Sequence, residues 1–172
     1  MKEFETNQLF VKNEDVEVLS LPYKDNSYAF NIFLPKNRLG LKKLRLQLSG
    51  VVIRNLLSRL KLESMTISIP KMKIDTNYEL KEALMVMGVT DIFSKQRANL
   101  LGISEQSLYV SDAAHRALIE VDEKGTTAAA ATYFRIWLQS RTRKQPRMFI
   151  ANHPFLFILS KDMNPFFIGQ YA

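Results

Sequence analysis

Few side chains in this sequence could carry catalysis. The chain contains no cysteine and two histidines, His115 and His153. His115 could act as a base for Ser107 or Ser111, but no motif supplies a nucleophile, a base and an oxyanion hole together. Without thiolates, and with so few imidazoles, neither nucleophilic catalysis nor a metal site is indicated. The sequence therefore points away from an enzyme and predicts no metal ligands.

A different property is indicated by residues 123–132, which read EKGTTAAAAT. Gly125 can adopt dihedral angles that other residues avoid, and the residues after it are small and uncharged. Such a segment can bend, extend and enter between packed strands, which is typical of a mobile loop that becomes a strand. The run of alanines also favours a helix, because alanine has the highest helix propensity. The residues alone leave both conformations open.

Positive charge is concentrated between residues 36 and 61, a stretch with little acid that includes Arg54, Arg59 and Lys61. These cations could bind a sulfated polysaccharide or another polyanion. An ordinary solvated helix face explains the same residues. The net charge of +7 favours acidic partners in general. Cations without interleaved aromatic residues do not support a nucleic-acid partner.

Composition sets the class of protein. A chain of 172 residues with 47% hydrophobic and 24% charged residues suits one folded domain of ordinary size. No apolar run approaches the ~20 residues of a membrane span, so we expect no membrane partner. The polar start, MKEFET, differs from a signal peptide, which predicts that the chain stays where it is made.

The elements that position these residues are mainly strands. Two runs rich in apolar, β-branched and aromatic residues, Val16–Leu21 and Tyr28–Leu34, predict a hairpin. Helical spacing follows over Leu39–Leu62, and we expect Gly40 and Gly50 to interrupt it.

Strand patterns return after this helical stretch. Met65–Ile69 alternates, and Lys71–Asp75 continues in an extended register. Thr76 and Glu79 form a capping-box pattern for a short helix that Gly88 can end.

The last third of the chain is again strand-like. Leu108–Val121 predicts one long strand, with His115 on its small-to-apolar face. Three short apolar runs separated by proline, Met148–Ala151, Phe155–Leu159 and Phe166–Ile168, predict three further strands.

Several of these segments resemble the serpin family, and they occur in serpin order. They are Leu19–Tyr23 with Phe33–Pro35, Ile69–Met72 with Tyr78–Lys81, Met87–Val89 with Ile92–Phe93, Ser111–Ala117 with Val121–Gly125, and Asn152–Phe155. The small-residue hinge, the strand that leads into it and the Asn-His-Pro-Phe signature are jointly specific. The resemblance implies an α+β fold, serpin-like, with mainly antiparallel β-sheets and a few short helices. It covers nearly every residue but matches only the C-terminal half of a serpin. Residues 1–172 are therefore expected to be the C-terminal portion of a single serpin domain, truncated so that the N-terminal half is absent.

The resemblance implies a function as a serine-type endopeptidase inhibitor, not an enzyme. In serpins a protease attacks the reactive-centre loop, here about residues 123–147, and the cleaved loop inserts into the central sheet before the acyl-enzyme is hydrolysed. The hinge residues would be Glu123, Gly125, Thr126, Ala128, Ala129, Ala130 and Ala131. A non-inhibitory serpin with a carrier, chaperone or storage role, or an inactive fragment, is the alternative.

The position of the cleaved bond is open. The usual family spacing from Glu123 places it between Gln139 and Ser140. Arg141 and Arg143 would instead fit the carboxylate-floored pocket of a trypsin-like protease. The target class is accordingly serine endopeptidases, with cysteine endopeptidases as the alternative.

The family also suggests roles for residues outside the loop. In serpins, the residue that matches His115 helps control opening of the central sheet. The residue that matches His153 has a structural role. Some serpins bind sulfated polysaccharides on basic helices, and no other cofactor is implied. Location in the extracellular space is expected from the family, with the cytoplasm as the alternative. Unpaired strand edges and Phe-rich C-terminal strands predict self-association if this portion stands alone.

Overall fold

The computed structural model describes residues 2–122 and 146–172. Its contacts divide the chain into two compact units, and each is described by itself. Unit 1 comprises Met1–Lys71 and Val121–Ala172, and unit 2 comprises Met72–Glu120. Within the described residues, no helix has the length and apolar character needed to cross a membrane.

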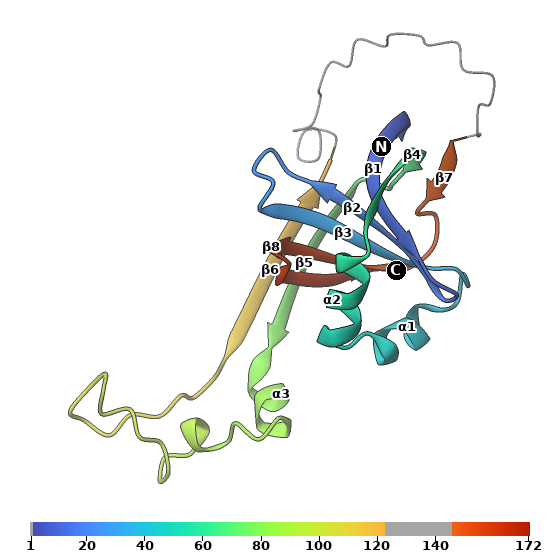
Figure 1. Cartoon of the computed structure of the whole chain (residues 1–172). Helices are drawn as coiled ribbons and strands as arrows, with labels where there is room; N and C mark the ends of the chain where they lie inside the picture. Colours follow the sequence, from blue (N-terminus) through green and yellow to red (C-terminus); the bar gives the residue numbers. More distant parts are fainter. Residues whose placement is uncertain (1, 123–145) are drawn as a thin grey trace, which may run out of the picture. The chain divides into compact units, whose positions relative to one another are not determined.

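Unit 1 is built on a seven-stranded sheet with the order β7-β4-β1-β2-β3-β8-β9 (Figure 1). Its neighbours are antiparallel except for β4 and β7, which run parallel. The strands are β1 (Lys2–Lys12), β2 (Val16–Pro22), β3 (Tyr28–Pro35), β4 (Lys61–Ser68), β7 (Arg147–Ile150), β8 (Phe155–Lys161) and β9 (Asn164–Tyr171). The prediction of mainly antiparallel sheets is thus confirmed.

The predicted hairpin is formed by β2 and β3. Its register pairs Val16 with Pro35 and Leu21 with Phe30. The turn is closed by the Asp25 carboxylate, which accepts a hydrogen bond from the Ser27 backbone N–H at 3.0 Å. Both strands are buried over most of their length, which explains why they read as nearly continuous apolar runs.

Two short helices, α1 (Leu41–Gln47) and α2 (Gly50–Ser58), pack on one face of this sheet. They contribute Leu44, Ile53, Leu56 and Leu57 to a cluster shared with sheet residues such as Phe33. The helices separate at the extended residues Leu48 and Ser49, and the Ser49 hydroxyl caps α2 by accepting from the Val52 N–H at 3.3 Å. The predicted break at Gly50 therefore lies one residue after the observed break at Leu48 and Ser49. The side-chain cap of Ser49, not the glycine, begins the second helix.

Unit 2 contains a two-stranded sheet of β5 (Met72–Glu79) and β6 (Ala114–Val121, whose last residue belongs to unit 1), helix α3 (Leu80–Val86) and the 3-10 turn η1 (Asp91–Phe93). Gly88, with φ of 94°, ends the helical segment as predicted.

The predicted capping box of α3 is wrong, because β5 continues up to the helix. Glu79 occupies the N-cap position and makes no side-chain cap hydrogen bond. Thr76 lies within β5, and its hydroxyl donates to the Ala117 carbonyl at 3.3 Å. The long strand predicted over Leu108–Val121 begins only at Ala114.

Candidate functional site: the strands that flank the bait segment

Most residues predicted to act directly on a protease lie outside the described residues. These are the hinge residues Glu123, Gly125, Thr126, Ala128, Ala129, Ala130 and Ala131, and the bond candidates Gln139, Ser140, Arg141 and Arg143. Their assignments stay predictions. The predicted reactive-centre loop, about residues 123–147, is called the bait segment below. The structure does describe the strand that leads into it, β6, and the strand that follows it, β7.

Strand β6 ends at Val121, two residues before the predicted hinge begins. Burial alternates along its second half, where Ala117 and Ile119 are half-buried while Leu118 and Glu120 are exposed. This alternation agrees with the predicted small-to-apolar face. In the described part of the chain, β6 has a single sheet partner, β5.

The β5–β6 pair is joined by charged side chains. Arg116 donates from Nη2 to Asp75 Oδ2 at 2.6 Å and from Nε to Asp75 Oδ1 at 3.0 Å. Lys73 and Glu120 form a second pair at 3.4 Å. The hydrogen bond from Arg116 lowers the pKa of the Asp75 carboxyl, and the same bond raises the pKa of the Arg116 guanidinium. These contacts hold β6 at its β5 edge and leave the other edge unobstructed by them.

His115 lies in β6, next to Arg116, and its side chain is exposed. The sequence placed His115 on the small-to-apolar face of this strand, where burial would be expected, and the described residues do not bury it. Its predicted role in gating the sheet stays a prediction. Ser111 lies before β6, where its carbonyl accepts a hydrogen bond from Lys81 Nζ at 2.8 Å.

Strand β7 follows the bait segment directly and is fixed by Arg147. Arg147 Nη1 lies 2.9 Å from Glu63 Oε2, and its guanidinium carbon lies 4.9 Å from the centroid of the Phe10 ring. The Phe10 ring in turn packs edge-on against Phe149 at 6.3 Å. An outermost strand of four residues is thus held by an ion pair, a cation–π contact and an aromatic core contact. Sequence reasoning missed this anchor, because its partners lie on strands distant in sequence.

The C-terminal signature has a structural role, as predicted for His153. Its Nε2 donates to the Pro35 carbonyl at 2.6 Å, which joins the segment between β7 and β8 to the end of β3. A carbonyl oxygen can only accept, so this contact places a proton on Nε2. No group of three or more potential metal ligands occurs among the residues that the structure describes.

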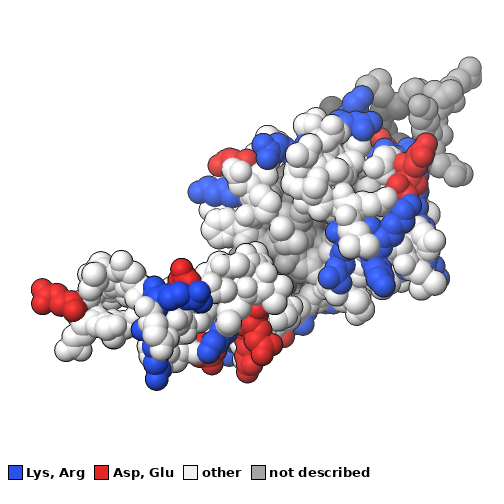
Figure 2. All heavy atoms as spheres, turned by 90° about the horizontal axis from the view of Figure 1, so that it is seen from below, with Lys and Arg blue, Asp and Glu red and all other residues white. Residues whose placement is uncertain are grey.

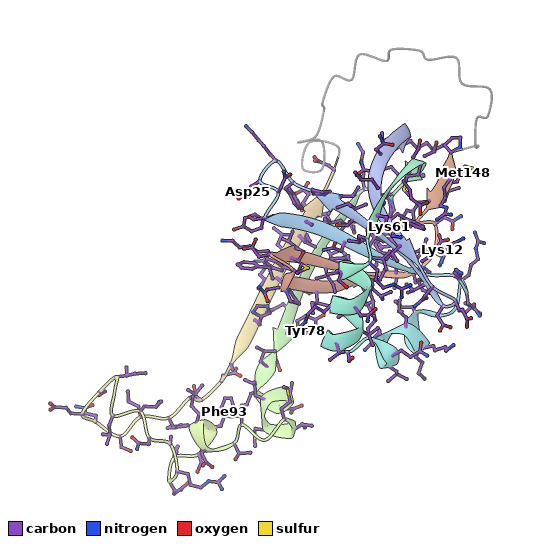
Figure 3. All side chains as sticks on the ribbon, in the orientation of Figure 1. Lys12, Asp25, Lys61, Tyr78, Phe93 and Met148 are labelled. Carbon is purple, nitrogen blue, oxygen red and sulfur yellow. The ribbon has the colours of Figure 1, made fainter. Side chains whose placement is uncertain are left out.

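The predicted polyanion-binding residues are all exposed. Arg54 lies on α2, Arg59 at its C-cap, and Lys61 at the start of β4. None of the three forms an ion pair with another described residue. Figure 3 shows Lys61 with Lys12, whose strands are paired at Phe10 and Lys61. The cations are therefore available to an anionic ligand, and the sulfated polysaccharide stays a prediction.

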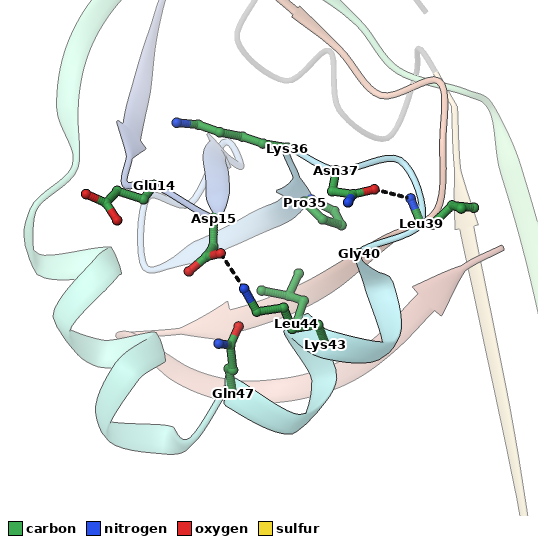
Figure 4. Close-up of a pocket in the computed structure, with 10 residues that line it drawn as sticks. All are labelled: Glu14, Asp15, Pro35, Lys36, Asn37, Leu39, Gly40, Lys43, Leu44 and Gln47. Carbon is green, nitrogen blue, oxygen red and sulfur yellow. Dashed lines mark hydrogen bonds and ion pairs between the residues drawn. The ribbon is translucent and has the colours of Figure 1, made fainter.

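A pocket of about 550 Å³ lies beside α1, between the β1–β2 turn and the segment after β3 (Figure 4). Lys36 and Lys43 of the basic stretch line it together with Glu14 and Asp15. Lys43 Nζ is 2.8 Å from Asp15 Oδ1, so the lysine charge is already balanced there. None of the predicted site residues lines this pocket, and its mixed charge does not select for an anion.

Comparison with known proteins agrees with this arrangement of strands. A family model described as "Serpin (serine protease inhibitor)" matches residues 1–172. Iripin-2 of Ixodes ricinus is 38% identical over 94% of this chain and 41% of its own length. Intracellular coagulation inhibitor 1 of Tachypleus tridentatus is 37% identical over 83% of this chain and 34% of its own length. The chain thus spans 34 to 41% of the length of these curated relatives.

The crystal structure of native protease nexin-1 with heparin superimposes with a TM-score of 0.82. The match has 26% identity and covers 98% of this chain and 45% of that structure. The predicted serpin-like fold class is confirmed. The chain belongs to the serpin family.

Proposed function

We propose that the protein containing this chain inhibits serine-type endopeptidases as a suicide substrate, with residues 123–147 as its bait. Family membership supports the class of activity. The observation that carries the mechanism is β6: it leads directly into the bait, and within the described residues only one of its edges is paired. A strand with an open edge is a template for another strand.

In this mechanism a protease nucleophile attacks a peptide carbonyl in the bait and forms an acyl-enzyme, while the new amino terminus leaves. The bond follows Gln139, Arg141 or Arg143. The segment on the N-terminal side of the cut then adds along the open edge of β6. Gly125 accommodates the dihedral change, and the small residues after it can be buried without an unsatisfied charge.

Insertion between two strands requires a second edge for the backbone hydrogen bonds of the new strand. Here β6 supplies one edge, and the chain spans 34 to 41% of its relatives' lengths. The second candidate function follows from this fact. The 172-residue chain by itself would offer the bait and be cleaved without trapping the protease.

Arg141 and Arg143 favour a trypsin-like serine endopeptidase as the target. A cysteine endopeptidase that accepts a basic residue would use the same bait. Family resemblance favours action in the extracellular space, with the cytoplasm as the alternative. One relative, from Tachypleus tridentatus, is named an intracellular coagulation inhibitor.

The experiment is incubation of the chain with trypsin-, chymotrypsin- and cathepsin-like proteases, followed by denaturing electrophoresis and mass spectrometry. For the chain alone we expect cleavage between residues 139 and 144 without a covalent complex. A denaturant-stable complex would establish inhibition and show that a second edge is unnecessary. Cleavage confined to other segments would refute the bait assignment.

Two variants sharpen this test. R141Q/R143Q should abolish trypsin cleavage after residues 141 and 143, whereas K95Q/R97Q, which removes the same charge from unit 2, should leave it unchanged. In any longer form that traps a protease, T126R should convert the inhibitor into a substrate, because a charged side chain would be buried on insertion. An unchanged stoichiometry of trapping in T126R would contradict the insertion step.

A further inference from the structure

Helices α1 and α2 have outward sides that the proposed inhibitory mechanism does not use. Both helices bury one side in the same apolar cluster on the sheet, through Leu44 of α1 and Ile53, Leu56 and Leu57 of α2. Because both pack on that cluster, their opposite sides both face away from the sheet (Figure 1). Each of the two short helices therefore has an outer side that is not packed on this cluster.

Large aliphatic side chains project from these outer sides. Leu39, which precedes α1, is 92% exposed, Leu46 of α1 is 83% exposed, and Val51 of α2 is 74% exposed. On a 3.6-residue repeat, Leu46 lies opposite Leu44, and Val51 lies opposite the buried side of α2. We call Leu39, Lys42, Leu46, Val51 and Arg54 the outer helix face. Exposed apolar residues in such a group indicate a binding surface.

The charged residues of α1 and α2 have a single sign, and the acidic side chains of Glu14 and Asp15 border α1 at the pocket that Leu39 also lines. Residues 36–62 contain lysine and arginine but no aspartate or glutamate. Lys42, Arg45 and Arg54 make no ion pair within the described part of the chain, whereas Lys43 is paired at the margin with Asp15. Seen from below, Lys and Arg side chains are exposed on unit 1, with Asp and Glu side chains beside some of them (Figure 2). Cations and exposed aliphatic side chains therefore occur together on the outer helix face.

We infer that the outer helix face binds the surface of an anionic lipid bilayer. Cations attract acidic headgroups, and aliphatic side chains on the same surface can enter the boundary between headgroups and acyl chains. A sulfated polysaccharide would use the cations but offers no apolar phase to Leu39, Leu46 and Val51. The observations thus favour a bilayer over a polysaccharide. The expectation of no membrane partner rested on the lack of a spanning segment, which surface binding does not need.

This inference is independent of the bait. The test is binding of the full 172-residue chain to vesicles of phosphatidylcholine alone, or with 30% phosphatidylserine, at physiological salt. We expect binding only to the vesicles that contain phosphatidylserine. K42Q/R54Q should weaken binding by about 25-fold, since each cation near an anionic surface contributes roughly fivefold. K24Q/K95Q removes the same charge elsewhere and should have a much smaller effect.

The aliphatic residues provide the decisive comparison. L39S/L46S/V51S keeps every charge and should weaken vesicle binding about tenfold or more, because the apolar insertion is lost. L101S/I103S makes similar changes at exposed residues of unit 2 and should bind as the parent does. Because all these side chains are exposed, the thermal unfolding of each variant should match the parent.

Retention on a heparin column separates the two ligand classes. If the serine variant binds vesicles as tightly as the parent, or if the parent binds heparin but not phosphatidylserine vesicles, the bilayer proposal is wrong and the surface is a polyanion site. Equal binding to neutral vesicles would also overturn it, because the cations would then have no role. Weakened vesicle binding with unchanged heparin retention in L39S/L46S/V51S would support it.

Discussion

The anchor of β7 makes a prediction about the C-terminal end of the bait. Replacing Arg147 by methionine removes the Glu63 ion pair and the cation–π contact with Phe10 but keeps an apolar side chain on that ring. The Arg147 and Glu63 side chains are 35% and 36% exposed, so water partly screens the pair. An exposed pair contributes about 0.2–1 kcal/mol, and a cation–π contact about 0.5–1 kcal/mol. We therefore expect R147M to weaken the attachment of β7 by about 1.5 kcal/mol.

The weaker attachment of β7 can be measured by amide hydrogen exchange, using NMR. The Ala151 N–H donates to the Ser68 carbonyl at 2.9 Å, immediately after β7, so its exchange reports opening of this strand. About 1.5 kcal/mol corresponds to an exchange rate roughly tenfold faster at Ala151. The amides of the β2–β3 hairpin should change much less, because β7 is the outermost strand of the sheet.

A matched control uses the pair between Lys43 and Asp15, whose side chains are 64% and 53% exposed. K43M should change stability by less than about 0.5 kcal/mol and leave Ala151 unchanged. If Ala151 exchanges at the same rate in R147M as in the parent, the anchor does not hold β7. If every amide accelerates equally, β7 does not open separately from the rest of the sheet, and the local argument fails.

Two further predictions concern the units separately. G169A should destabilise unit 1 by about 1–3 kcal/mol in urea unfolding, because a Cβ at this position would lie 2.2 Å from the Phe157 ring. The control is G102A, because a Cβ there meets nothing within 4 Å and should cause no steric clash. D75N should remove the stability that Asp75 gains from Arg116. Because the folded pKa of Asp75 lies below its ordinary value of 3.8, that contribution is present above pH 3.8 and is lost as the pH falls through the folded pKa. Thermal unfolding of the parent and D75N should therefore differ near neutral pH and converge in acid, and a constant difference across this range would contradict the role of the carboxylate.

Local patterns predicted much of unit 1. The runs that became β2, β3 and β8 are buried over most of their length, and an apolar run needs no knowledge of its partner to be recognised. Strand β1 was not predicted. Its first half is polar, and it is placed by backbone pairing with β2 on one side and with β4 on the other. Pairing with a strand distant in sequence leaves no periodic signal in the strand itself.

The errors in unit 2 have a related cause. Thr76 and Glu79 have the spacing of a capping box, yet β5 extends to Glu79 because its residues are paired with β6. The Thr76 hydroxyl then donates to Ala117 and not to the helix. Tertiary pairing has overridden a local preference, which contributes only about 1 kcal/mol.

The bait assignment, which stays a prediction, rests on local features of the sequence: a glycine at the hinge and small residues after it. The driving force of insertion is not local, because it depends on which strand edges receive the new strand. The structure supplies one such edge on β6, held from its other side by β5 through the Arg116–Asp75 and Lys73–Glu120 pairs. Each backbone hydrogen bond made on insertion contributes about 1 kcal/mol net, so a strand paired on one side gains roughly half of what full insertion would provide. If the proposed mechanism holds, cleavage and trapping should therefore be separable: the predicted bait, residues 123–147, would determine the first, and the second would require a further strand beside β6.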